Sequence, residues 1–70
     1  SFLDDIVSEA LKSTHEKQIL AFSRIIASII NKWKDDDSFR TYLDVLKSRL
    51  EQLVVAKSQP ALSIYIWVRL

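Results

Sequence analysis

The sequence contains no cysteine, no glycine and no methionine, and only one proline and one histidine among its 70 residues. Without cysteine there can be no disulfide, no thiolate metal site and no cysteine nucleophile. Without glycine there can be no glycine-rich phosphate loop. Tight turns and β-hairpins are also expected to be few, because glycine supplies the positive φ angles that they require. These absences exclude several classes of enzyme and favour a helical protein.

A dominant charge is lacking as well, since ten Lys and Arg face nine Asp and Glu. This balance gives no bias toward nucleic acid or an anionic membrane. No apolar run approaches the roughly 20 residues of a membrane-spanning helix, and no secretory leader is visible. We therefore expect a cytoplasmic and nuclear protein without membrane contact. The missing initiator methionine and the apolar last residues lead us to expect an internal segment of a longer chain.

Apolar side chains at helical spacing are the abundant feature of the sequence, and 49% of its residues are hydrophobic. Steps of three and four residues predict an all-α fold of about four helices. The first helix is expected at residues 2–12, the second up to about Lys34, the third from Phe39 to about Ala56, and the last from Pro60 to Leu70. The predicted core consists of Ile19, Phe22, Ile26, Ile29, Trp33, Phe39, Leu43, Leu46, Leu50, Leu53 and Trp67.

The joins between the helices carry capping signals. Ser13 and Glu16 have the spacing of a capping box, which predicts the start of the second helix. One of Asp36, Asp37 and Ser38 is expected to cap the third helix. Because the join after Lys34 is short, we expect the second and third helices to be antiparallel neighbours.

The last segment, residues 60–70, leaves two structures open. Its β-branched and aromatic content is typical of a strand. The proline at its start and the absence of glycine turns favour a helix buried on several sides. We expect the helix, with a covering neighbour beyond residue 70.

A motif that recurs within the sequence suggests a repeated architecture. Phe2-Leu3-Asp4 returns as Tyr42-Leu43-Asp44, 40 residues later, and the helix starts at Ser13 and Ser58 lie 45 apart. Both separations are typical of HEAT or armadillo units of about 40–47 residues. The sequence therefore predicts antiparallel helical hairpins in one helical segment, residues 1–70, made of two HEAT-like units of a longer α-solenoid. A small independent helical bundle is the alternative.

No constellation of residues points to catalysis, a cofactor or a metal. His15 lies alone in the first turn of a helix, and Asp35-Asp36-Asp37 lacks the ligand spacing of a calcium loop. We therefore predict no enzyme, no cofactor and no metal site. A helical domain that binds nucleic acid through Arg24, Lys32 and Lys34, or binds a partner helix, is the alternative to a protein scaffold.

Three short motifs resemble a known family. Ala27-Ser28-Ile29-Ile30-Asn31-Lys32, then Leu43-Asp44, then Ile66-Trp67-Val68 resemble the C-terminal HEAT repeats of the scaffold subunit of the cytosolic iron–sulfur assembly targeting complex. That family is also known in nucleotide-excision repair and transcription. It usually continues Trp-Val with Thr-Lys-Ala-Leu, whereas Arg69-Leu70 follow here.

The resemblance implies a non-enzymatic scaffold that binds no cluster itself. Its expected partners are a WD-repeat propeller and a small adaptor, which together deliver iron–sulfur clusters to apoproteins, many of them polymerases and helicases acting on DNA. Direct nucleic-acid binding is then not expected. The isolated chain is expected to self-associate through the apolar surface of residues 64–70. No docking residue is assigned.

Overall fold

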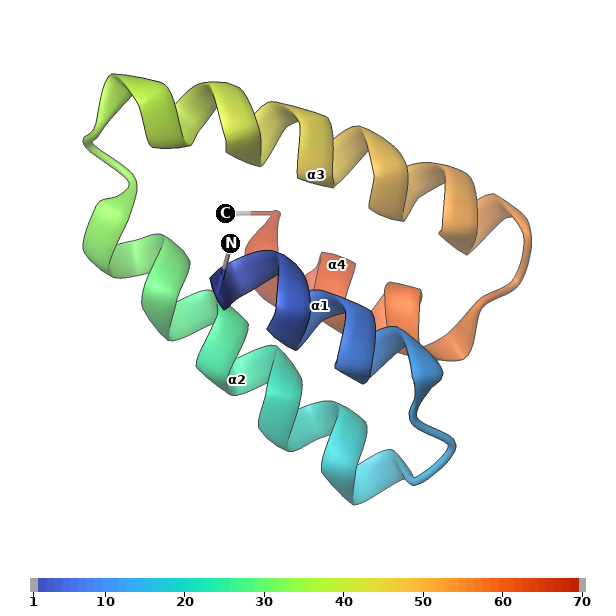
Figure 1. Cartoon of the computed structure of the whole chain (residues 1–70). Helices are drawn as coiled ribbons and strands as arrows, with labels where there is room; N and C mark the ends of the chain where they lie inside the picture. Colours follow the sequence, from blue (N-terminus) through green and yellow to red (C-terminus); the bar gives the residue numbers. More distant parts are fainter. Residues whose placement is uncertain (1, 70) are drawn as a thin grey trace.

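The computed structural model describes residues 2–69 and consists of four α-helices joined by short connections (Figure 1). Helix α1 spans Phe2–Lys12, α2 spans Glu16–Trp33, α3 spans Asp37–Val55 and α4 spans Gln59–Val68. The prediction of an all-α fold is confirmed. The last segment is a helix as far as Val68, so the strand alternative is wrong for residues 59–68, and Leu70 lies outside the described residues.

Side-chain caps explain where α3 and α4 begin. The Asp36 carboxylate accepts a hydrogen bond of 2.9 Å from the Phe39 backbone N–H at the start of α3. The Ser58 hydroxyl accepts one of 3.3 Å from the Ala61 N–H at the start of α4. The predicted capping box at Ser13 is wrong, because α2 begins with His15 as its N-cap.

The reason is that Ser13 belongs to the end of the preceding helix. Its backbone N–H donates to the Ala10 carbonyl at 3.1 Å, which extends the hydrogen bonding of α1. Its hydroxyl donates to the side chain of Gln18 at 2.7 Å. The hydroxyl also accepts a hydrogen bond of 3.4 Å from the His15 backbone N–H, so it does not bond the Glu16 N–H as a capping box requires.

The turn between α3 and α4 shows how the chain manages without glycine. The backbone N–H groups of Lys57 and Ser58 donate to the carbonyls of Val54 and Leu53, both at 2.9 Å, which is a Schellman motif. The motif requires a left-handed residue, and Lys57 takes this conformation with φ of 68°. A residue with a Cβ is strained there by about 1–2 kcal/mol relative to a right-handed conformation.

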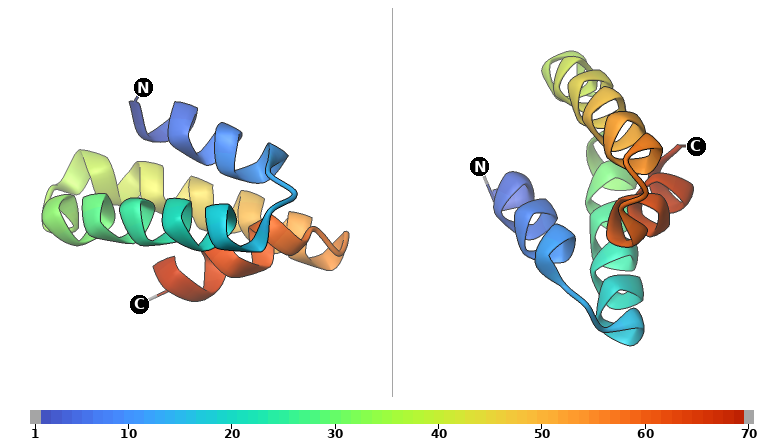
Figure 2. Two further views of the ribbon diagram at one scale, coloured as in Figure 1. Left: turned by 90° about the horizontal axis from the view of Figure 1, so that it is seen from below. Right: turned by 90° about the vertical axis from the view of Figure 1, so that its right-hand side faces the viewer.

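Helices α2 and α3 form a V, and α1 and α4 pack against them (Figure 1). The two helices of the V run in opposite directions from their join and diverge (Figure 1). Helix α4 packs against both of them, whereas α1 packs mainly against α2 and also touches α4. Viewed from below, α1 and α4 lie on opposite sides of the α2–α3 pair (Figure 2).

The prediction that the second and third helices are packed neighbours is therefore wrong. A short join fixes where two helices meet, but not how far they stay together. Burying the apolar side of α4 against both partners separates α2 from α3 along most of their length. The pairs α1–α2 and α3–α4 each pack within themselves, as expected for helical hairpins.

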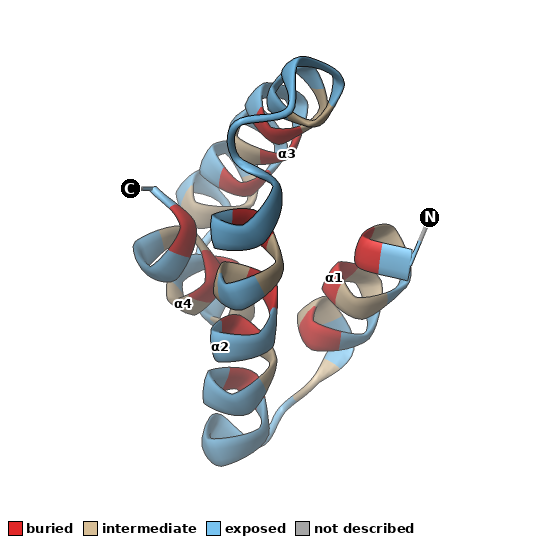
Figure 3. Cartoon of the chain, turned by 90° about the vertical axis from the view of Figure 1, so that its left-hand side faces the viewer, coloured by how far each residue is buried: buried red, intermediate tan, exposed pale blue. Residues whose placement is uncertain are grey.

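The core fills the space where all four helices meet, and buried positions face inward on each helix (Figure 3). Five of the predicted core residues are buried, namely Ile19, Ile26, Leu43, Leu46 and Leu50. Four others are half-buried, namely Phe22, Ile29, Phe39 and Leu53, and all four pack against the core. Buried residues outside the predicted set are Leu3, Val7, Ala10, Ser23, Ile30, Ala61, Ile64 and Val68.

Two of the predicted core residues lie at the surface. Trp33 is 50% exposed and Trp67 is 38% exposed. Each lies in the last turn of its helix, where the neighbouring helices no longer cover that side. Helical periodicity identified the correct side of the helix for burial, but the ends of that side are open.

One polar contact is built into the packing of α2 on α4. The buried Ser23 hydroxyl lies 2.8 Å from its own-helix carbonyl at Ile19 and 3.0 Å from the hydroxyl of Ser63. Within residues 2–69 the structure leaves no buried side-chain polar atom without a hydrogen-bond partner. The small, paired serines let the two helices approach closely without leaving a polar atom unsatisfied.

Candidate protein-interaction groove

A groove lies between α2, α4 and α3, on the side of α2 that α1 does not cover. It has a volume of about 460 Å³. Its base contains the buried side chains of Ile30, Leu43 and Val68. We call it the Arg24–Trp67 groove, and its lining residues are Arg24, Ala27, Ser28, Ile30, Asn31, Lys34, Leu43, Lys47, Trp67 and Val68.

The sequence of α2 explains one wall of this groove. Arg24, Ala27, Ser28 and Asn31 follow one another at steps of three, one and three residues, so they share one side of the helix. Ile26, by contrast, points into the core and is fully buried. Helix α2 therefore presents an apolar side to the core and a mainly polar side to the groove.

A cation–π contact joins the α2 wall of the groove to its α4 wall. The Arg24 guanidinium lies 5.8 Å from the ring centroid of Trp67. Such a contact stabilises by roughly 0.5–1 kcal/mol at an exposed site. It places a positive charge on one face of the indole ring and links the middle of α2 to the last turn of α4.

The charged groups that line the groove are all positive. Arg24 comes from α2, Lys34 from the residue that ends α2, and Lys47 from the middle of α3. Among residues 2–69, none of these three cations forms an ion pair with a carboxylate. The ion pair found in this part of the chain joins Lys12 to Glu9. A chain with a formal net charge of only +1 thus gathers three cations at one hollow.

An adjoining hollow balances part of this charge. It is lined by Lys34, Asp35, Arg40, Leu43, Asp44 and Lys47. It adds two carboxylates and one further cation, Arg40, to the two lysines that it shares with the groove, so the combined surface stays positive.

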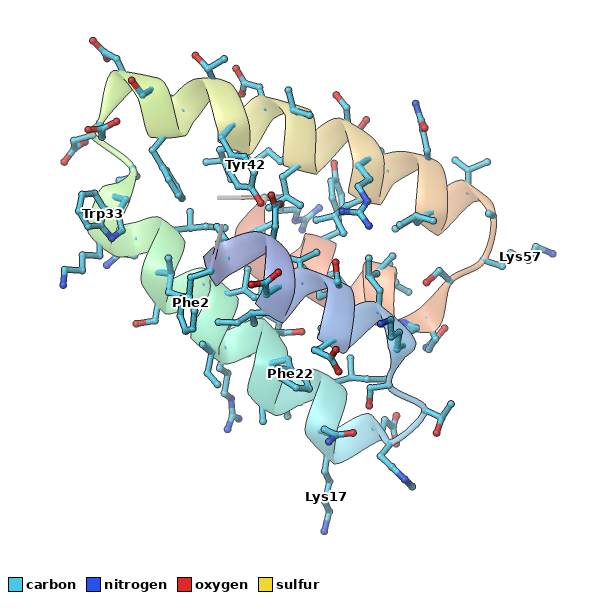
Figure 4. All side chains as sticks on the ribbon, in the orientation of Figure 1. Phe2, Lys17, Phe22, Trp33, Tyr42 and Lys57 are labelled. Carbon is cyan, nitrogen blue, oxygen red and sulfur yellow. The ribbon has the colours of Figure 1, made fainter. Side chains whose placement is uncertain are left out.

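A second, aromatic hollow opens where α1 meets the α2–α3 join. It has a volume of about 450 Å³ and is lined by Phe2, Leu3, Ile29, Trp33, Ser38, Phe39 and Tyr42. Figure 4 shows Trp33 beside the join and Phe2 at the start of α1. The rings of Phe39 and Tyr42 are tilted, with centroids 5.9 Å apart.

A part-buried hydrogen bond lies at one side of this aromatic hollow. The Tyr42 hydroxyl donates to the Asp4 carboxylate and so ties α3 to α1. Burial of the phenol, helped by this bond and by the charge of Asp4, raises the pKa of Tyr42 above its ordinary value of 10.0. Tyr42 therefore acts as a structural tie, because it stays protonated at neutral pH.

A third hollow lies between the first turns of α2 and α4, with a volume of about 380 Å³. Leu20, Leu62 and Ile66 line it and are all exposed. This hollow is mostly apolar and lacks the cluster of cations found in the Arg24–Trp67 groove. Its lining residues are Glu16, Lys17, Ile19, Leu20, Gln59, Leu62, Ser63 and Ile66.

The residues considered for chemistry are not brought together as a catalytic or metal site. His15 is exposed and serves as the N-cap of α2 through its backbone. Asp36 caps α3, so one of the three consecutive aspartates has a structural role. No cluster of His, Asp and Glu suited to a metal ion occurs within residues 2–69. Across the same residues no helix is long and apolar enough to span a bilayer.

The cations of the alternative nucleic-acid hypothesis are only partly brought together. Arg24 and Lys34 line the same groove, whereas Lys32 does not. Lys47, which the sequence did not single out, completes the positive lining from α3. No local signal could have placed it there, because its position depends on how α3 packs against α4.

The motif residues behind the family resemblance converge on this groove. Asn31 from α2, Leu43 from α3 and Trp67 from α4 all line it. The sequence pattern of a known family matches residues 1–69, and that family, MMS19_C, is described as RNAPII transcription regulator C-terminal. No curated protein and no solved structure matches the chain. Because the match covers almost all of its length, this chain belongs to the RNAPII transcription regulator C-terminal family.

Proposed function

We propose that this chain is part of a non-enzymatic protein-interaction scaffold. Membership of the RNAPII transcription regulator C-terminal family over residues 1–69 supports a role connected with transcription. The motif resemblance described above supports the narrower role of helping to deliver iron–sulfur clusters to apoproteins. In this role the chain binds proteins and holds neither a cluster nor a substrate.

The observation that carries the proposal is a complete core combined with exposed large apolar side chains. The centre of the molecule is closed, with Ile26, Leu50 and Ile64 fully buried. Exposed apolar side chains that gather at hollows are typical of protein-interaction sites. The exposed set is Phe2, Leu20, Ile25, Trp33, Val45, Val55, Leu62, Ile66 and Trp67.

We also propose that the two helical hairpins are two HEAT-like units of a solenoid. The pairing of α1 with α2 and of α3 with α4, followed by stacking of α2 on α4, supports this arrangement. Ser23 and Ser63, which meet across the α2–α4 contact, are separated by 40 residues. That separation falls within the length of about 40–47 residues of one HEAT repeat.

The partners that the proposal names are a WD-repeat propeller protein and a small adaptor, and the expected location is the cytoplasm and nucleus. The test is affinity purification of the full chain from cell extract, with identification of the proteins retained after a high-salt wash. We expect both partners to be retained in stoichiometric amounts. Retention of neither partner would contradict the role in cluster delivery.

Nucleic-acid binding is the competing function, since Arg24 and Lys34 share one groove with an aromatic ring. It would appear as binding to single-stranded DNA that weakens steeply with salt and needs no protein partner. We expect such binding to be negligible, because the formal net charge of the whole chain is only +1.

A further inference from the structure

We propose that the Arg24–Trp67 groove docks an acidic segment of a partner protein and seats one apolar side chain of that segment on the groove base. This inference rests on the scaffold function proposed above. It names the groove as one docking site and an acidic segment as the part of the partner that binds there. It follows from three features of the groove, which are its cations, its base and its neighbouring carboxylates.

The first feature is the concentration of unpaired positive charge. Arg24, Lys34 and Lys47 come from two helices and a helix end, so the fold gathers cations that are spread along the sequence. Lys47 is half-buried and forms no ion pair within residues 2–69. A carboxylate that enters the groove would be attracted to this ammonium and could accept a hydrogen bond from it.

The second feature is the apolar base between these cations. Ile30, Leu43 and Val68 form a continuous buried surface, and Trp67 lies beside it with 38% of its surface exposed. The volume of about 460 Å³ lies within the range of about 300–1,000 Å³ typical of binding sites. An aromatic anchor beside a desolvated base is typical of the residues that dominate protein–protein affinity.

The third feature argues against a nucleic-acid backbone as the occupant. Asp35 and Asp44 lie with Arg40 in the adjoining hollow, so a chain of phosphates that extends beyond the groove would meet mixed charge there instead of a continuous positive surface. Arg24 already covers one face of the Trp67 ring, which reduces the area on which a base could stack. A short acidic peptide avoids both conflicts, because its charges end with the groove.

The Arg24–Trp67 contact gives the groove a means of recognising charge. The guanidinium lies 5.8 Å from the ring centroid and is exposed to solvent on its other sides. A carboxylate can accept hydrogen bonds from the guanidinium while the ring holds it in place. Arg24 is therefore assigned as the main contact for the acidic group, with Lys47 as the second.

The test is selection of peptides by the immobilised full chain from a random phage-displayed library. We expect the selected peptides to be acidic and to carry an aromatic or large aliphatic residue. Arg24→Glu with Lys47→Glu should weaken the binding of these peptides by about tenfold or more, because each change replaces an attraction by a repulsion. Lys32→Glu is the matched control, since Lys32 lies outside the groove lining and should leave binding within about twofold.

Circular dichroism and urea unfolding establish that the variants fold. If the double Glu variant does not fold, the variant Arg24→Gln with Lys47→Gln is used in its place. It removes the two positive charges without reversing them. Selection of neutral or basic peptides, or of none, would overturn the inference. Equal weakening by Lys32→Glu would also overturn it, because the binding would then depend on overall charge.

The same variants separate this inference from the scaffold function. If the Glu double variant still retains the propeller and the adaptor from extract, the groove is not the docking site although the scaffold function stands. If the unmodified chain retains neither protein, the function itself is wrong. Tight binding of oligothymidylate that the double variant abolishes would assign the groove to nucleic acid and overturn the inference.

Discussion

The centre of the molecule and the Arg24–Trp67 groove use the same helices for different purposes. In the centre, Ile26, Leu50 and Ile64 are fully buried and touch residues from several helices. In the groove, Trp67 contacts the Arg24 guanidinium and remains 38% exposed. The comparison teaches that an apolar residue at the correct helical spacing can serve stability or recognition, depending on how far neighbouring helices extend over it.

The largest expected effect comes from the centre. Ile26→Ala should lower the free energy of unfolding by about 3–4 kcal/mol, because the buried side chain leaves a cavity that its neighbours cannot fill. Ile25→Ala is the matched control on the same helix, where the side chain is 47% exposed. The control should cost less than about 1 kcal/mol in urea unfolding. Equal losses for the two variants would show that α2 is turned differently in the packed structure.

Trp67→Ala should have a smaller effect on stability than Ile26→Ala, although it removes a larger side chain. We expect a loss of about 1–2 kcal/mol, which combines part of the ring's burial with the Arg24 contact. Urea unfolding monitored by circular dichroism measures it without relying on tryptophan fluorescence. A loss as large as that of Ile26→Ala would place Trp67 in the core and remove it from the groove.

Lys57→Gly should change stability in the opposite direction. Glycine relieves the left-handed strain at φ of 68° but loses more chain entropy on folding. The net result should be a gain of up to about 1 kcal/mol. Lys57→Ala is the control, because alanine keeps the Cβ and should leave the unfolding midpoint nearly unchanged. A destabilised glycine variant would contradict the Schellman turn between α3 and α4.

The smallest effect concerns alkaline pH at the aromatic hollow. Because the pKa of Tyr42 is raised in the folded chain, the folded state holds its proton more tightly than the unfolded state does. The stabilisation is therefore complete below the unfolded value of about 10 and is lost as the pH rises toward the folded value. Urea midpoints should fall more between neutral and strongly alkaline pH for the unmodified chain than for Tyr42→Phe. An equal fall in both would show that folding does not raise the pKa of Tyr42 and would contradict its burial against α1.

Several parts of the fold could be predicted because their causes are local. The apolar stripes, which include Ile19 and Ile26 on α2 and Leu50 on α3, identified the helices and their inward sides. Asp36 was among the three residues expected to cap α3. Other parts depend on packing between distant segments. The separation of α2 from α3 results from how α4 packs against both, which no spacing within either helix records.

The groove could be predicted only in fragments for the same reason. Arg24, Lys32 and Lys34 were grouped as candidate nucleic-acid contacts, and Trp67 was predicted to lie in the core, but nothing in the sequence relates them in space. Their meeting, and the addition of Lys47, follow from the packing of α4 against α2 and α3. The exposure of Trp33 was not predicted, because helical periodicity shows which side of a helix faces the core but not how deeply each residue on that side is buried.

The most direct test of the account is to measure stability and partner binding on the same groove variant, Arg24→Glu with Lys47→Glu. The account separates core from groove, so it predicts an unfolding midpoint close to that of the unmodified chain and partner retention reduced by about tenfold or more. Full retention of the partners by a folded variant would contradict the account. So would a parallel loss of stability and binding, because the groove would then be part of the core.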